Sequence, residues 1–272
     1  MSQSFLLSAH GSDISVLSLS SSQTHNSFSI GTPESISALT ISATDPDRLC
    51  VITTAGSLSL WYWKSGKRIG VGKPFETIQR VEFFEACHGD RVQKAVACLR
   101  RREDGIMQIL TTVLDENDLS SQAKEVTILE TSLPVTELRV SQSGMVVFAL
   151  ARRRLLVGRT TITPDANCVC EYDWREIVLP FEPTTLDIRE YSKFLNRPRH
   201  ESATRISNSV DLAVGNFDGS ILVYGDIANT LWETDDAQQD CVPDSLVSQR
   251  LHWHREGPGS LRWSKDGRYL SA

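Results

Sequence analysis

The sequence lacks the long apolar run that a membrane-spanning helix requires, about 18 residues or more. It also lacks a Lys or Arg ahead of a hydrophobic segment near its N-terminus, so we expect neither secretion nor insertion into a membrane. Positive charge is not in excess, because 28 Lys and Arg stand against 34 Asp and Glu and the formal net charge is -6. This balance excludes a protein that binds nucleic acid with its whole surface, although a local basic patch is compatible with it.

Motifs of the common enzyme classes are missing as well. The sequence has no Gly-x-Ser-x-Gly, no His-Glu-x-x-His, no phosphate-binding loop and no dinucleotide fingerprint, and Gly70-Val71-Gly72 lacks a third Gly. We therefore expect a protein without enzymatic activity, catalytic residues, cofactor or small-molecule substrate.

Cysteine is present in a pattern that does not suggest a metal site. The six cysteines stand at positions 50, 87, 98, 168, 170 and 241, mostly within apolar runs, which predicts buried, reduced thiols. Cys168 and Cys170 are separated by one residue and have no second Cys or His pair at zinc-finger spacing. We expect no bound metal.

The apolar segments that the sequence does contain are short and typical of β-strands. They are four to eight residues long in most cases, rich in Val, Ile, Leu and aromatic residues, and separated by Gly, Asp, Ser and Asn. Helical periodicity is weak, and only residues 226–233 are compatible with two helical turns. An α/β nucleotide-binding fold is therefore not expected.

A repeated order of strands and turns predicts the architecture. Stretches of the sequence share the order strand, turn, strand, tight turn, strand, and these stretches are residues 36–66, 81–110, 135–158, 210–224 and, in part, 254–270. Between the turns that join the last two strands, Gly56 to Gly105 is 49 residues, Gly105 to Arg153 is 48, and Arg153 to Gly219 is 66. Such periods suit a β-propeller whose blades have about 40 to 45 residues and elaborated loops.

The repeats resemble the WD-repeat family. Its pattern is matched by His254, by Ser264-Lys265-Asp266-Gly267, by Asp218-Gly219, and by Trp61 followed by Ser65-Gly66. The resemblance implies structural roles within the blades for Trp61, Gly56, Asp218, Gly219, His254, Trp263, Asp266 and Gly267. For His252 and His254 we accordingly expect a structural role rather than metal binding, and for Asp218 and Asp266 a role in turns rather than in acid catalysis.

The expected fold class is an all-β WD-repeat β-propeller that is incomplete, with about four whole blades and two half blades in a single domain, 1–272. The expected parts are a half blade at 1–31 holding a third and a fourth strand, blades at 32–70, 78–115 and 134–160, a blade with an insertion at 161–225, and a truncated blade at 251–272.

A narrower resemblance comes from the C-terminal repeat. Leu251-His252-Trp253-His254 followed by Leu261-Arg262-Trp263-Ser264 is similar to WD-repeat subunits of the small-subunit processome, the U3 small nucleolar RNA-associated proteins of the transcription-coupled group. Members of that group are longer and have two propellers, so the resemblance implies a fragment of the N-terminal propeller.

This resemblance implies a non-enzymatic scaffold that acts in pre-18S rRNA processing and ribosome biogenesis and supports ribosomal DNA transcription by RNA polymerase I. Its expected location is the nucleus and nucleolus. Its expected partners are other subunits of the transcription-coupled subcomplex, and U3 ribonucleoprotein and pre-rRNA, directly or indirectly. A generic WD-repeat adaptor in a signalling or ubiquitin-ligase complex is the alternative.

Two arginine runs are the candidate contact residues for RNA or a protein partner. The runs are Arg100, Arg101, Arg102 and Arg152, Arg153, Arg154, each predicted at or beside the turn that joins the last two strands of a blade. Corresponding turns of a propeller lie on one face, so we expect six guanidinium groups to gather there. Ordinary solvated turn charge is the alternative.

Overall fold

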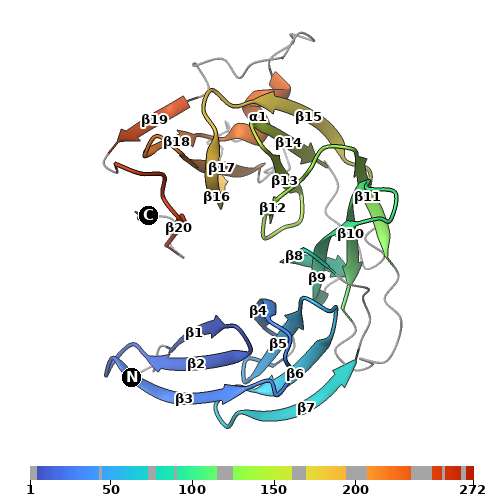
Figure 1. Cartoon of the computed structure of the whole chain (residues 1–272), viewed down its shortest axis with the longest axis vertical. Coiled ribbons are helices and arrows are strands. Elements are labelled where there is room, and N and C mark those ends of the chain that lie inside the picture. The colour runs from blue at the N-terminus through green and yellow to red at the C-terminus, as the bar shows by residue number, and fades with distance from the viewer. Residues whose placement is uncertain are drawn as a thin grey trace, which may run out of the picture. The chain divides into compact units, whose positions relative to one another are not determined.

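The structure is a computed structural model of the chain (Figure 1). It describes residues 5–42, 45–72, 78–88, 91–114, 125–160, 170–193, 207–233, 247–252, 255–264 and 268–272.

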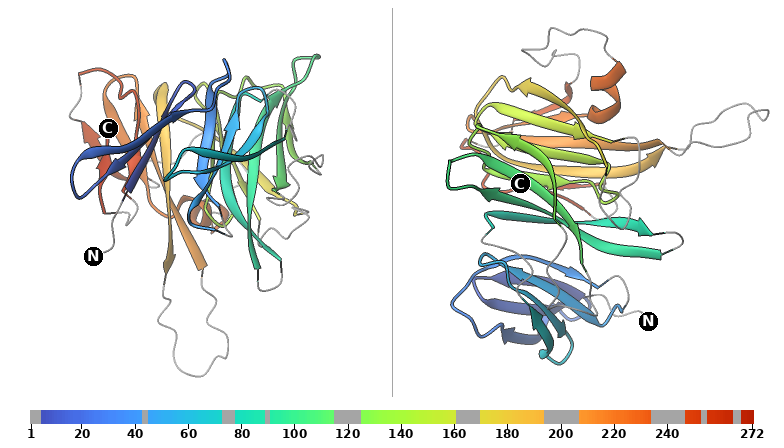
Figure 2. Two further views of the ribbon diagram at one scale, coloured as in Figure 1. Left: turned by 90° about the horizontal axis from the view of Figure 1, so that it is seen from below. Right: turned by 90° about the vertical axis from the view of Figure 1, so that its right-hand side faces the viewer.

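The described residues divide into two compact units, and each contains three antiparallel sheets. The first unit comprises residues 1–132 and 163–170, and the second comprises residues 133–162 and 171–272. Within every sheet, strands that follow one another in the chain are hydrogen-bonded neighbours, which short turns make possible. Figure 2 shows these sheets from two further sides as separate twisted ribbons.

The first unit has one three-stranded and two four-stranded sheets. Its strands are β1 (Phe5–His10), β2 (Asp13–Ser18) and β3 (Gln23–Ser29); β4 (Ile36–Ile41), β5 (Arg48–Thr53), β6 (Leu58–Tyr62) and β7 (Lys67–Gly72); and β8 (Arg80–His88), β9 (Arg91–Arg101), β10 (Met107–Val113) and β11 (Val126–Thr131).

The second unit has two four-stranded sheets, a two-stranded sheet and a helix. Its elements are β12 (Glu137–Val140), β13 (Val146–Ala151), β14 (Arg154–Arg159) and β15 (Asp173–Val178); β16 (Pro183–Lys193), β17 (Ser207–Asn216), β18 (Ser220–Tyr224) and β19 (Val247–His252); β20 (Arg262–Trp263) and β21 (Leu270–Ser271); and α1 (Ile227–Glu233).

The core of each unit lies between consecutive sheets, because the middle strands are apolar on both faces. In the first unit, one buried cluster joins the β1–β3 and β4–β7 sheets through Ile14, Leu49 and Trp61, and a second joins the β4–β7 and β8–β11 sheets. In the second unit, Phe148 and Leu212 belong to the cluster between the β12–β15 and β16–β19 sheets. First strands of consecutive sheets also touch, β4 with β8 and β12 with β16. Small antiparallel sheets stacked face to face in this way define a β-propeller, as the sequence predicts.

The structure confirms the all-β fold class and the helix predicted near residues 226–233. It corrects the predicted blade boundaries at the outer strands. The first sheet has three strands rather than two, since β3 pairs with β2. The strands β11, β15 and β19 pair with β10, β14 and β18, although they lie beyond the predicted ends of those blades at residues 115, 160 and 225. These edge strands are polar and half-exposed, so they carry no apolar run that a sequence search detects.

Candidate interaction site at the β13–β14 turn

The turns between the second and third strands of the four-stranded sheets contain one residue with positive φ each. In three of them this residue is a glycine, Gly56 at +83°, Gly105 at +87° and Gly219 at +83°. In the β13–β14 turn it is Arg152, at +55°. The repeat should therefore be aligned on Arg152 and not on Arg153, which corrects the spacing derived from the sequence. A side chain with a Cβ costs about 1–2 kcal/mol in this conformation, and glycine avoids that cost.

The first arginine run lies partly in a strand. Arg100 and Arg101 are in β9, and only Arg102 stands in the turn before β10. Arg100 donates to Glu125 at 3.1 Å and to Gln108 at 3.2 Å. Arg102 forms an ion pair with Asp104 at 3.1 Å and a longer one with Glu130 at 3.6 Å. Two of these three charges are thus neutralised by carboxylates.

The second arginine run forms the β13–β14 turn itself. Ala151 pairs with Arg154 across the hairpin, which leaves Arg152 and Arg153 as the two turn residues. The Arg153 guanidinium donates to the Leu179 carbonyl at 3.0 and 2.8 Å, so it anchors the turn to the segment after β15. Arg154 pairs with Glu176 at 2.6 Å. Arg152 is exposed and has no hydrogen bond or ion pair with any residue that the structure describes.

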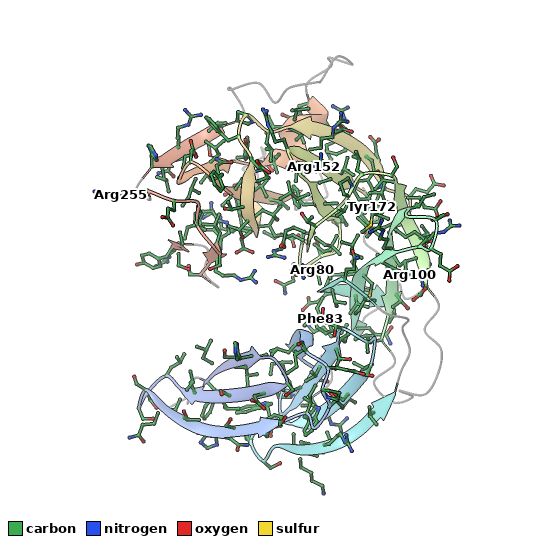
Figure 3. All side chains as sticks on the ribbon, in the orientation of Figure 1. Arg80, Phe83, Arg100, Arg152, Tyr172 and Arg255 are labelled. Atoms are coloured by element: carbon green, nitrogen blue, oxygen red, sulfur yellow. The ribbon has the colours of Figure 1, made fainter. Side chains whose placement is uncertain are left out.

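Figure 3 labels one arginine of each run, Arg100 and Arg152. The two runs belong to different units. The gathering of six guanidinium groups on one face remains a prediction.

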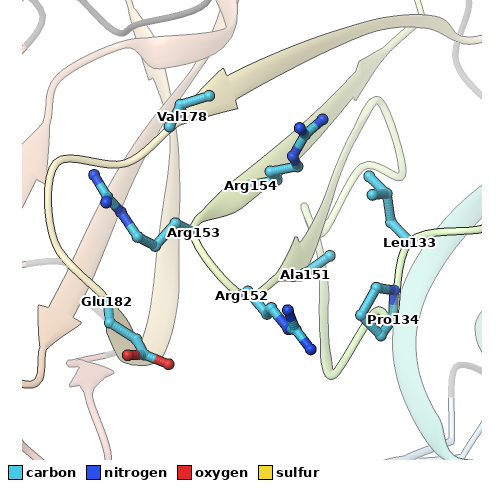
Figure 4. A pocket seen from close by; sticks show the side chains of 8 residues that line it. All are labelled: Leu133, Pro134, Ala151, Arg152, Arg153, Arg154, Val178 and Glu182. Carbon is cyan, nitrogen blue, oxygen red and sulfur yellow. The ribbon is translucent and has the colours of Figure 1, made fainter.

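A pocket of about 570 Å³ lies beside the β13–β14 turn, within the second unit (Figure 4). It is lined by Leu133, Pro134, Ala151, Arg152, Arg153, Arg154, Val178 and Glu182. The chain enters β12 and leaves β15 at the same end of the sheet as this turn, because alternate strands run in opposite directions. Three separate segments therefore contribute apolar and charged groups to one concave surface.

The blade residues implied by the family resemblance occupy structural positions where they are described. Trp61 is buried, donates through Nε1 to the Ser59 hydroxyl at 2.9 Å, and stacks on Phe28 of the neighbouring sheet. Trp263 packs partly buried against the cluster between the β16–β19 and β20–β21 sheets. His254, Asp266 and Gly267 lie outside the described residues.

Asp218 is a turn residue, in agreement with the expectation. Its carboxylate accepts the Ser220 hydroxyl at 2.6 Å and the Ser220 N–H at 3.0 Å. The hydroxyl contact is the main reason that the pKa of Asp218 is lowered from its ordinary value. Nε2 of His252, in β19, lies 3.3 Å from the Asp218 carbonyl oxygen. Both side chains therefore act within the turn of one blade.

Two buried carboxylates were missed by the sequence analysis. Asp187 in β16 accepts the Trp263 N–H at 2.7 Å and Arg262 Nη1 at 3.2 Å, and it lies 3.7 Å from Arg139 Nε in the preceding sheet. It therefore joins three consecutive sheets of the second unit.

Asp211 in β17 accepts Arg189, the Tyr191 hydroxyl and the Asp226 N–H, the last two at 3.2 and 2.8 Å. Arg189 also lies over the Trp263 ring, 4.4 Å from its centroid. The sequence offers one signal for Asp187 and Asp211, which is an acidic residue within an apolar strand. A buried charge requires partners, so such a residue indicates a carboxylate that is paired in the fold.

Cysteine thiols and membrane segments give no further site within the described residues. Cys50 and Cys98 are buried and are not in disulfides, and burial is the main cause that raises the pKa of Cys98 to about 12. The described residues contain no group of three or more potential metal ligands, and Cys168 lies outside them. Nor do they include a helix with the length and apolar character to cross a membrane.

Comparisons with known proteins support the fold alone. No family model matches the chain, and no curated protein matches it either. Among solved structures, it is similar to a functionally unknown protein from Desulfotomaculum acetoxidans, with a TM-score of 0.54 and 12% identity. That similarity covers 98% of this chain and 70% of the other. The fold defines the class: the chain is a β-propeller, and its arrangement is consistent with a WD-repeat-like fold.

Proposed function

We propose that this β-propeller is a non-enzymatic scaffold subunit of the small-subunit processome. Support comes from the WD-repeat-like blades together with the similarity of residues 251–264 to the processome WD-repeat subunits. In this role the chain acts in pre-18S rRNA processing and ribosome biogenesis and supports ribosomal DNA transcription. Rigid sheets that present variable turns are suited to hold several partners at once.

The observation that carries a scaffold role is the pocket at the β13–β14 turn, where the exposed Arg152 side chain has no hydrogen bond or ion pair with a described residue. A concave surface that is exposed to solvent and combines charged with apolar side chains is suited to bind a partner. The proposed partners are other subunits of the transcription-coupled subcomplex, with U3 ribonucleoprotein and pre-rRNA contacted directly or indirectly. The proposed location is the nucleus, within the nucleolus.

Affinity purification of the tagged full-length protein tests this proposal, with sequencing of bound RNA and identification of bound proteins. We expect U3 RNA, pre-rRNA and processome subunits to be enriched over an unrelated propeller purified in parallel. Depletion should lower the levels of processed 18S precursors and ribosomal DNA transcription. Normal levels of both would refute the processome role, and a cytoplasmic signalling or ubiquitin-ligase complex in the purification would favour the adaptor alternative.

A further inference from the structure

The lining of the β13–β14 pocket includes one cation and one anion that have no partner among the described residues. Arg152 and Glu182 are both exposed, both line the pocket, and neither side chain forms an ion pair or hydrogen bond with a described residue. Figure 4 shows Glu182 to the left of Arg152 in the lower part of the view, with Arg153 above them. The pocket thus presents separated charges of opposite sign.

Half of the residues that line the pocket are apolar, namely Leu133, Pro134, Ala151 and Val178. Phe217 is joined to the lining residue Glu182 through its backbone, because its N–H donates to the Glu182 carbonyl at 2.8 Å, and this aromatic residue is 74% exposed. An exposed aromatic residue beside a pocket is typical of surfaces that bind other proteins.

The backbone at Arg152 is a second, independent sign of a binding role. The corresponding turns use glycine, whereas this one keeps a long cationic side chain at a φ of +55°. The side chain forms no hydrogen bond or ion pair with a described residue, so no polar contact within the described part of the chain accounts for this conformation. Strained residues of this kind are concentrated at ligand-binding sites.

The charge pattern favours a peptide over RNA. A phosphate backbone requires accumulated positive charge. Here three arginines line the pocket, but Arg154 is paired with Glu176 and Arg153 is held by the carbonyl oxygens of Leu179 and Pro180. Glu182 adds a negative charge that has no partner among the described residues. A polypeptide segment instead supplies carboxylate, apolar and basic side chains within a few residues, and it matches all three features of the surface.

We infer that the β13–β14 pocket binds an extended segment of a partner protein that carries an acidic, a basic and an apolar residue within a few positions of one another. The acidic side chain pairs with Arg152, the basic one with Glu182, and the apolar one packs on the apolar lining residues. The inference rests on the scaffold role proposed above, but not on its assignment to ribosome assembly.

Selection from a phage-displayed library of random 12-residue peptides tests the inference on the purified full-length chain. Selected peptides are then synthesised with a fluorescent label, and their affinity is measured by fluorescence anisotropy. We expect the selected sequences to share an acidic, a basic and an apolar residue within a few positions of one another. Failure to select any peptide above background overturns the inference.

Charge variants give the sharper test. Arg152→Gly should weaken binding of the selected peptides at least tenfold while the melting temperature stays equal or rises, because glycine relieves the backbone at that position. Glu182→Arg should weaken peptides with a basic residue, and the double variant Arg152→Glu with Glu182→Arg should prefer peptides with the charges reversed. Lys67→Ser is the matched control, since Lys67 is also an exposed cation whose side chain has no partner among the described residues, and it should change affinity less than twofold.

Two further outcomes would overturn the inference. One is an Arg152→Gly variant that binds the peptides within twofold of the parent. The other is binding of a labelled 12-nucleotide poly(U) RNA that depends on Arg152 and strengthens in Glu182→Arg, which would assign the pocket to RNA. Neither result depends on nucleolar location or rRNA processing. Failure of the peptide-binding inference can therefore be distinguished from failure of the proposed processome role.

Discussion

Replacing Asp187 by Ala should destabilise the second unit more than any exposed charge substitution. The Asp187 side chain is 11% exposed and that of Arg139 is 12% exposed, so their attraction is weakly screened by water. Loss of the carboxylate also removes the acceptor of the Trp263 N–H, and leaving a buried donor without an acceptor costs about 1–3 kcal/mol. Breaking a buried ion pair costs about 3–5 kcal/mol when the remaining charge has no other partner.

The expected loss lies below the sum of these values, because Arg139 keeps other contacts. It reaches Glu137 at 3.5 Å and donates to the Leu138 carbonyl at 2.8 Å. We therefore expect Asp187→Ala to lower the free energy of unfolding by about 3 kcal/mol. Asp187→Asn should lose about half as much, since the amide oxygen still accepts the Trp263 N–H.

Urea unfolding followed by tryptophan fluorescence measures these differences, provided that the slope of the transition is the same in each variant. Asp47→Asn is the control, because the Asp47–Lys64 pair is half-exposed and should contribute less than about 0.5 kcal/mol. A loss below about 1 kcal/mol for Asp187→Ala, or one no larger than that of the control, would refute the reasoning that Asp187 joins three sheets.

Three further predictions concern a glycine, a turn carboxylate and a thiol. Gly215→Ala should lower the free energy of unfolding by about 2 kcal/mol, since its Cβ would lie 2.4 Å from Pro258 Cγ. Gly259→Ala is the control and should change it by less than about 0.5 kcal/mol, since no heavy atom lies within 4 Å of the Cβ position. Equal effects of the two substitutions in thermal unfolding would contradict this prediction. The lowered pKa of Asp218 stabilises the folded chain at pH values above the ordinary carboxyl pKa of about 3.9. The parent protein should therefore melt at a higher temperature than Asp218→Asn at neutral pH, and this difference should shrink in acid. A difference in melting temperature that does not depend on pH would contradict this prediction. Burial and a pKa of about 12 should keep the Cys98 thiol unmodified by iodoacetamide at mildly alkaline pH in the folded chain but not in urea, as mass spectrometry of the peptides would show.

The inner parts of the fold were predictable from local chemistry. Strands such as β5, β13 and β18 are apolar because both of their faces are buried between sheets, so they appear as continuous hydrophobic runs. Gly56 and Gly219 marked their turns because the positive φ there favours glycine. These signals lie within a few residues of each other, and they suffice for the propeller class.

The rest depended on pairing between distant residues. Strand β3 is polar and becomes a strand only because β2 offers it hydrogen-bond partners, and Asp187 acquires its role only when Arg139 and Trp263 are brought to it. Likewise, the arginine run at residues 152–154 was visible in the sequence, but the different surroundings of its three side chains were not. Arg153 is anchored by the Leu179 carbonyl, Arg154 is paired with Glu176, and Arg152 has no such contact among the described residues. The sequence alone determined the class of fold through its turns and apolar strands. The tertiary structure alone decided which charges are neutralised and which remain available to a partner, because that depends on groups that are remote in the chain and adjacent in space.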